Sequence, residues 1–127
     1  MKTANDLVKI AKAQITDVSL AQAETACRKA DVIIDVREPD EYAAGHIEGA
    51  VSLPRGVLEF KIADLPAVSS ADTDILIYCK TGDRAALAAQ SLETLGYKNV
   101  VSIAGGYDAW TEAGKPTTAS NNGLDID

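Results

Sequence analysis

The stretch Ile75-Leu-Ile-Tyr-Cys79-Lys-Thr-Gly-Asp-Arg84 runs from four apolar residues into a cysteine and then into a short polar loop. The alanine-rich run at 85–89 strongly favours a helix. We therefore predict a buried strand over 74–79, a loop, and a helix over 84–95. Ligands bind at the carboxyl edge of open α/β sheets, where Cys79 would lie. Loop N–H groups and a helix N-terminus favour negative charge there, so the pattern predicts a cysteine nucleophile in an anion-binding cradle.

The candidate site residues are Cys79 as the nucleophile and, for binding the substrate, Lys80, Thr81, Gly82, Asp83 and Arg84. Gly82 gives the loop the conformational freedom to turn its N–H groups inward around an anion. The guanidinium of Arg84 is suited to hold loop carbonyls or an anionic ligand, and Lys80 presents a positive charge to an anionic substrate. A carboxylate repels anions, so we interpret Asp83 as the N-cap of the helix. Thr81 either donates its hydroxyl or is an ordinary loop residue.

Length and composition narrow the class of protein. The 127 residues fit one domain, and a net charge of −7 argues against nucleic acid as a partner. No apolar run approaches the roughly 20 residues of a membrane helix. The charged N-terminus does not resemble a secretory signal, so we expect a cytoplasmic protein whose Cys27 and Cys79 form no disulfide. With one histidine and no C-x-x-C motif, we expect neither a metal nor another cofactor. The oligomeric state stays open.

Strands and helices alternate along the chain. Apolar patterns and turn signals predict strands at 14–18, 32–36, 50–53, 74–79 and 99–103, and helices at 20–30, 38–45, 57–62, 84–95 and 107–113. This alternation predicts a three-layer α/β domain with a mainly parallel sheet over residues 15–116. Gly45 is expected to end the helix at 38–45 as a left-handed C-cap. The small, polar residues 117–127 are expected to form a flexible tail.

A helical extension, residues 1–14, precedes this domain. Its sequence predicts an amphipathic helix over 3–13 with Thr3 as its cap. Leu7, Ile10 and Ala11 fall on one face of that helix. The extension either packs as an extra layer or mediates a contact, and the sequence favours neither.

Two further residues, Cys27 and His46, could take part in a reaction, but we assign both a structural role. Cys27 shares a helix face with Leu20 and Ala23, so we interpret it as a small core residue. His46 is the only histidine, and a cysteine–histidine dyad would have to use it. We interpret it as a structural, hydrogen-bonding residue, because a thiol that its cradle already ionises needs no base.

Three separated segments are together similar to the single-domain rhodanese-like sulfurtransferases. The first contains Asp35-Val-Arg37-Glu38 and Gly45-His-Ile-Glu-Gly-Ala50, the second is the loop at 79–84, and the third is Gly105-Gly-Tyr-Asp-Ala-Trp110. The resemblance implies a five-stranded parallel sheet flanked by helices. It also implies that the first segment is mainly architectural and that Trp110 lies in the core or a pocket wall.

The resemblance implies that Cys79 takes a sulfane sulfur from a small anionic donor such as thiosulfate, forms a persulfide, and passes the sulfur to cyanide, a thiol or a protein. Lys80 stands where many relatives have arginine. One alternative is a sulfur relay or a non-catalytic binding module of the same fold. Another is a phosphatase or arsenate reductase, which is disfavoured because such loops place arginine about six positions after the cysteine. Here Arg84 follows Cys79 by five.

Overall fold

Five parallel strands form the central sheet of the structure, which is a computed structural model that describes residues 1–119. Their order across the sheet is β1-β6-β5-β2-β4, and every neighbouring pair is parallel. The strands are β1 (Thr16–Val18), β2 (Val32–Asp35), β4 (Val51–Ser52), β5 (Asp74–Tyr78) and β6 (Asn99–Ile103). The predicted parallel α/β sheet is confirmed, and β5, the strand that leads to Cys79, lies at its centre.

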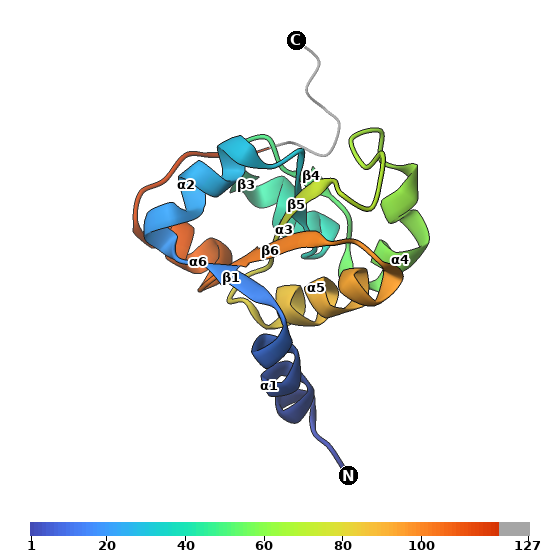
Figure 1. Ribbon diagram of the computed structural model, residues 1–127. Coiled ribbons are helices and arrows are strands. Elements are labelled where there is room, and N and C mark those ends of the chain that lie inside the picture. The colour runs from blue at the N-terminus through green and yellow to red at the C-terminus, as the bar shows by residue number, and fades with distance from the viewer. Residues whose placement is uncertain (120–127) are drawn as a thin grey trace.

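Helices cover both faces of the sheet, which confirms the predicted three layers (Figure 1). They are α1 (Ala4–Gln14), α2 (Leu20–Lys29), α3 (Pro39–Ala44), α4 (Leu58–Lys61), α5 (Asp83–Leu95) and α6 (Gly106–Glu112), with short 3₁₀ turns at Arg55–Val57 and Ile62–Asp64. Leu58 of α4 and Leu92 of α5 pack with the strands on one face. Ala23 of α2 and Trp110 of α6 pack on the other. Within residues 1–119, no helix is long and apolar enough to cross a membrane.

Helix α1 packs against α5, which is one of the two roles that the sequence left open, and its amino end projects away from the rest of the domain (Figure 1). Thr3 caps it as predicted. The side chains that it buries are Val8 and Ala11, whereas Leu7 and Ile10 are 48% and 39% exposed. The prediction of a Leu7–Ile10–Ala11 face was therefore wrong in part. Because the apolar residues of this helix spread over two adjoining faces, the contact with α5 decides which face is buried.

A small second sheet joins two distant segments. It pairs β3 (His46–Ile47) with β7 (Thr117–Thr118) in antiparallel fashion. The predicted flexible tail at 117–127 therefore begins with two residues of regular strand. Residues 120–127 lie outside the described part of the chain.

A buried carboxylate and a buried guanidinium tie β2 to its neighbours. Asp35 and Arg37 are 0% and 4% exposed, and Nη2 of Arg37 lies 2.7 Å from Oδ2 of Asp35. The hydroxyl of Tyr78 donates to the same carboxylate at 2.7 Å and accepts from the N–H of Ile47 at 3.0 Å. Burial, and then the Asp35 carboxylate, raise the pKa of Tyr78, so its hydroxyl stays protonated as the donor. Arg37 also donates to the carbonyl of Gly45 at 2.6 Å.

Gly45 ends α3, but not in the left-handed conformation that the sequence predicts. Its φ of 169° is extended backbone. Space requires the glycine instead, because a Cβ at this position would lie 2.6 Å from the hydroxyl oxygen of Tyr107. The prediction was wrong because turn signals describe the local backbone, whereas this constraint comes from a side chain of α6.

The Tyr78 hydroxyl should contribute measurably to stability. Tyr78→Phe leaves the buried N–H of Ile47 without its acceptor and removes one donor from Asp35, so we expect a loss of about 1–3 kcal/mol in the free energy of unfolding. Urea unfolding followed by circular dichroism measures this loss. Tyr97→Phe is the matched control, because the Tyr97 hydroxyl makes no hydrogen bond within residues 1–119. Equal stabilities of the two variants would contradict the role assigned to Tyr78.

Candidate active site

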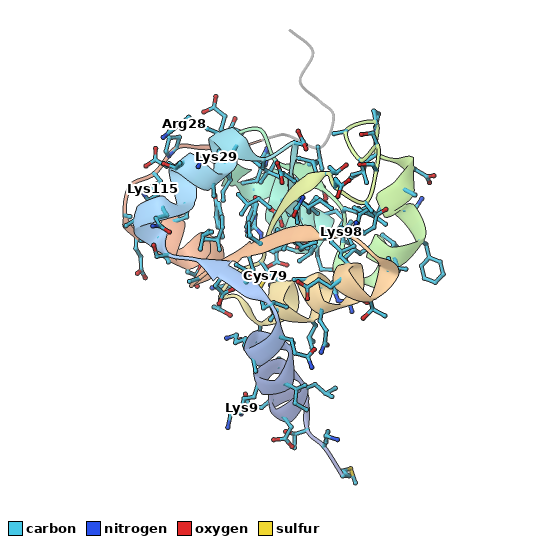
Figure 2. The ribbon with its side chains drawn as sticks, in the orientation of Figure 1. Lys9, Arg28, Lys29, Cys79, Lys98 and Lys115 are labelled. Atoms are coloured by element: carbon cyan, nitrogen blue, oxygen red, sulfur yellow. The ribbon has the colours of Figure 1, made fainter. Side chains whose placement is uncertain are left out.

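The sulfur of Cys79 lies inside the loop that joins β5 to α5. Cys79 is 1% exposed and lies near the amino end of α5 (Figure 2). The N–H groups of Gly82 and Ala85 donate to Sγ at 3.1 and 3.2 Å. Two N–H dipoles directed at one sulfur favour negative charge on it. The loop thus directs two backbone N–H groups at Sγ, and its role as an anion-binding cradle stays a prediction.

Gly82 makes the sharp turn that brings both N–H groups to the sulfur. Its φ is 112°, a left-handed value that glycine takes without steric cost. Gly82 itself occupies the N-cap position of α5, and Asp83 is the first helical residue. The prediction that Asp83 caps the helix was therefore wrong. The left-handed turn places the glycine, and not the carboxylate, at the position that precedes the helix.

The amino end of α6 supports the loop from behind. The N–H of Tyr107 donates to the carbonyl of Cys79 at 2.8 Å, and the N–H of Asp108 donates to the carbonyl of Lys80 at 3.0 Å. Gly106 permits this approach, because a Cβ on it would lie 2.6 Å from the Cys79 carbonyl oxygen. The sequence analysis placed Gly105-Gly106 in the third segment that resembles the family and assigned these glycines no contact with the loop. Two adjacent glycines before a helix are, however, also a signal of close backbone contact.

Each charged side chain of the loop forms an ion pair with a different helix. Arg84 binds Glu41 of α3 through two hydrogen bonds, of 2.9 and 3.2 Å. Lys80 binds Asp108 of α6 at 2.8 Å, and Asp83 binds Lys12 of α1 at 2.9 Å. Sequence reasoning missed all three partners. Arg84 was expected to hold loop carbonyls or an anionic ligand, but its guanidinium is bound to Glu41.

Three further residues singled out from the sequence are His46, Trp110 and Thr81. His46 is buried, its Nδ1 lies 2.8 Å from the carbonyl oxygen of Tyr42, and the two rings stack at 3.7 Å. Trp110 is buried and donates to the carbonyl of Pro116 at 2.9 Å. Thr81 is exposed, and its hydroxyl makes no hydrogen bond within residues 1–119.

Cys27 is half-buried and packs beside the cluster that contains Trp110. Burial raises the pKa of its thiol to about 11. At neutral pH the Cys27 thiol is therefore almost wholly protonated, which makes it a poor nucleophile.

A cavity of about 750 Å³ lies away from the loop. Its lining comes from α2, β1, the start of β5, the amino-terminal half of β6 and the last turns of α5, and includes Thr25, Asp74 and Glu93. Cys79 follows the carboxyl end of β5, at the opposite edge of the parallel sheet. The cavity is therefore separate from the candidate site.

The protein is thus an α/β domain with a parallel sheet and a buried thiol at the carboxyl edge of that sheet, where two loop N–H groups contact the sulfur. The family model of the rhodanese-like domain matches residues 17–113. The chain is 34% identical over 105 residues to a thiosulfate sulfurtransferase of Pseudomonas entomophila, which covers 83% of this chain and 93% of the relative. The chain belongs to the rhodanese-like domain family.

Two solved structures are also similar over almost the whole chain. One is a protein of unknown function, possibly a tyrosine phosphatase, from Rhodopseudomonas palustris, with 33% identity, a TM-score of 0.81, and 93% and 96% of the two chains covered. The other is the polysulfide-sulfur transferase homodimer of Wolinella succinogenes, with 32% identity, a TM-score of 0.75, and 95% and 90% covered. Together the relatives support a role in sulfur transfer.

The Arg84–Glu41 pair should make stability depend on acid pH. The hydrogen bond from Arg84 lowers the pKa of Glu41 from 4.5 to about 2. A carboxyl whose pKa is lowered on folding stabilises the folded state above its unfolded pKa, and this contribution is lost as the pH falls through the folded pKa. We expect Glu41→Gln to be less stable than the wild type near neutral pH, with a difference that shrinks as the pH falls from 4.5 toward 2.

Urea unfolding across this pH range measures the difference. Glu48→Gln is the control for loss of one negative charge, because Glu48 is exposed and forms no ion pair within residues 1–119. A Glu41→Gln deficit that stays constant from neutral to acid pH would rule out the proposed linkage.

Proposed function

We propose that this protein is a sulfurtransferase that moves a sulfane sulfur from thiosulfate or a related donor to a thiophilic acceptor through a persulfide on Cys79. The observation that carries the proposal is the pair of N–H groups, from Gly82 and Ala85, that point at Sγ. They stabilise a thiolate before the reaction and an anionic persulfide after the first step. The same geometry therefore serves both states of the cysteine.

The reaction proceeds in two displacements. The Cys79 thiolate attacks the outer sulfur of thiosulfate, a new sulfur–sulfur bond forms, and sulfite leaves with the electron pair of the bond that breaks. Cyanide, a thiol or a protein thiolate then attacks the terminal sulfur of the persulfide, and the Cys79 thiolate leaves. Each half-reaction has its own product, so the kinetics are ping-pong. The proposed location is the cytoplasm, where thiols stay reduced and can act as acceptors.

The remaining loop residues support the donor in different ways. Lys80 and Thr81 are exposed at the loop and are placed to meet the donor, and Gly82 supplies an N–H to the cradle. Arg84 acts through its pair with Glu41, which fixes the start of α5. In the sequence, Asp83 lies between Gly82 and Ala85, whose N–H groups contact Sγ. Its carboxylate forms an ion pair with Lys12.

Phosphate hydrolysis is the second candidate, because the similar protein from Rhodopseudomonas palustris is described as a possible tyrosine phosphatase. Two features of Arg84 favour sulfur over phosphate. Arg84 follows Cys79 by five positions and is bound to Glu41, so it is not free to clamp a phosphoryl group.

Cys79→Ser should abolish transfer of sulfur from thiosulfate to cyanide. It should also abolish the added mass of one sulfur atom that thiosulfate leaves on the wild type, as measured by mass spectrometry. Cys27→Ser is the matched control and should retain both activities, because the Cys27 thiol is protonated at neutral pH.

The same proteins should be assayed with an aryl phosphate. Robust phosphate release that requires Cys79, without thiosulfate turnover, would replace the proposal by a phosphatase. Stable sulfur addition with poor transfer to cyanide would indicate a relay to a protein acceptor, and no sulfur addition would indicate a non-catalytic module.

Lys80→Ala should weaken the use of thiosulfate without unfolding the protein. Lys80 is exposed, and its removal takes a positive charge from the loop and leaves the Asp108 carboxylate unpaired. We expect the KM for thiosulfate to rise about threefold to tenfold at low ionic strength and less at high ionic strength. Lys98→Ala is the matched control, because exposed Lys98 precedes β6 at the opposite edge of the sheet (Figure 2). A KM that is the same for both variants would refute this role for Lys80.

A further inference from the structure

Helix α1 lies outside the part of the chain that the family model matches, yet it contacts the Cys79 loop. The match begins at residue 17, and α1 ends at Gln14. Nζ of Lys12, in the last turn of α1, lies 2.9 Å from Oδ1 of Asp83. The helix is held there by the buried side chains of Val8 and Ala11. An element outside the shared family domain thus supplies a charge to the candidate active site.

The carboxylate that Lys12 meets is at an unfavourable place for an anionic substrate. Asp83 lies in sequence between Gly82 and Ala85, the two residues whose N–H groups donate to Sγ. The backbone of residue 83 therefore lies next to the sulfur that a donor has to reach. An unpaired carboxylate there would repel a negatively charged donor, and more strongly as the donor's charge increases.

The other charged side chains of the loop cannot offset an unpaired Asp83. Lys80 is already paired with Asp108, and Arg84 with Glu41. With Lys12 in place, the three ion pairs together carry no net charge. Without Lys12, the same set of side chains carries one net negative charge.

We propose that Lys12 of α1 is a positioning residue that neutralises Asp83 and thereby allows the loop to accept a doubly charged sulfur donor. This inference rests on the proposed function. Lys12 acts through Asp83 and needs no contact with the donor. Helix α1 thereby determines which donors the loop accepts according to their charge. With Lys12 the loop accepts the thiosulfate dianion, and without Lys12 it favours donors of lower charge.

The pair itself contributes little to folding, which makes the inference testable. The side chains of Lys12 and Asp83 are 44% and 57% exposed. Exposed ion pairs of this kind add little to stability, so Lys12→Ala should fold normally. The substitution should instead lower the rate of reaction with the donor, and this loss should depend on the donor's charge. A purely structural role would lower the rate equally for donors of any charge.

The experiment compares two donors that present the same kind of outer sulfur. Thiosulfate carries two negative charges, and an alkyl thiosulfonate anion carries one. In each case Cys79 attacks the outer sulfur, and sulfite or alkyl sulfinate leaves with the electron pair. The rate of persulfide formation on full-length protein is followed by mass spectrometry at increasing donor concentration. Circular dichroism and thermal unfolding check the fold of every variant.

We expect Lys12→Ala to lower the second-order rate of persulfide formation from thiosulfate about threefold to tenfold at low ionic strength. The loss with the thiosulfonate should be smaller, and salt should reduce both losses. Lys12→Arg should restore the rate, because it keeps the positive charge. Asp83→Asn in the Lys12→Ala background should also restore it, because the unpaired carboxylate is gone. Lys9→Ala is the matched control: Lys9 is exposed on the same helix, and its loss changes the net charge equally (Figure 2).

The outcomes separate the inference from the proposed function. Equal rates for Lys12→Ala and Lys9→Ala with thiosulfate would overturn the inference and leave the proposed function intact. An equal loss with both donors, or no recovery on Asp83→Asn, would mean that Lys12 acts on the fold of the loop and would also overturn it. If the wild type forms no persulfide from either donor, the proposed function fails and the inference fails with it.

Discussion

The ion pair between Asp35 and Arg37 is the interaction on which the rest of the structure depends. Both side chains are almost fully buried, and a buried pair is costly to break because either partner alone is an unpaired charge in the interior. The pair is retained here because each partner makes further bonds. Asp35 accepts from the Tyr78 hydroxyl at the end of β5, and Arg37 donates to the Gly45 carbonyl at the end of α3. The guanidinium also lies 4.2 Å from the centre of the Tyr107 ring in α6.

This network reaches the candidate site along the backbone. Tyr78 directly precedes Cys79, so its bond to Asp35 fixes the last residue of the strand that carries the thiol. Tyr107 packs on Arg37 with its ring and donates to the Cys79 carbonyl with its N–H. The thiol is therefore held from both sides by residues that share one buried pair. In this way the segment at 35–50 helps to fix the position of Cys79 through Tyr78 and Tyr107, without contacting Sγ.

The sequence predicted the parts of the site that are local in the chain. An apolar strand, a cysteine and a glycine-containing loop follow each other directly, so the position of Cys79 and the need for Gly82 could be inferred from spacing alone. The ion pairs could not, because Lys12, Glu41 and Asp108 lie 71, 43 and 28 residues from their partners in the loop. Asp83 was misinterpreted for a local reason: a carboxylate before a helix suggests a cap, but the left-handed turn at Gly82 puts the glycine at that position.

The proposed reaction requires an acidic protein to admit an anionic donor, and the charged side chains near the loop bear on this requirement. The chain carries a net charge of −7, which repels anions at long range. Salt screens that field over about 10 Å at 0.1 M ionic strength, so the decisive charges are those near Sγ. There each negative side chain of the group is matched by a positive one, and the two N–H groups of the cradle add partial positive charge. On the proposed function, a thiosulfate that reaches the loop would meet three neutral ion pairs and two N–H groups that favour negative charge. The partners in these pairs come from helices α1, α3 and α6, so the charge around the loop is set by the tertiary fold as well as by the loop sequence.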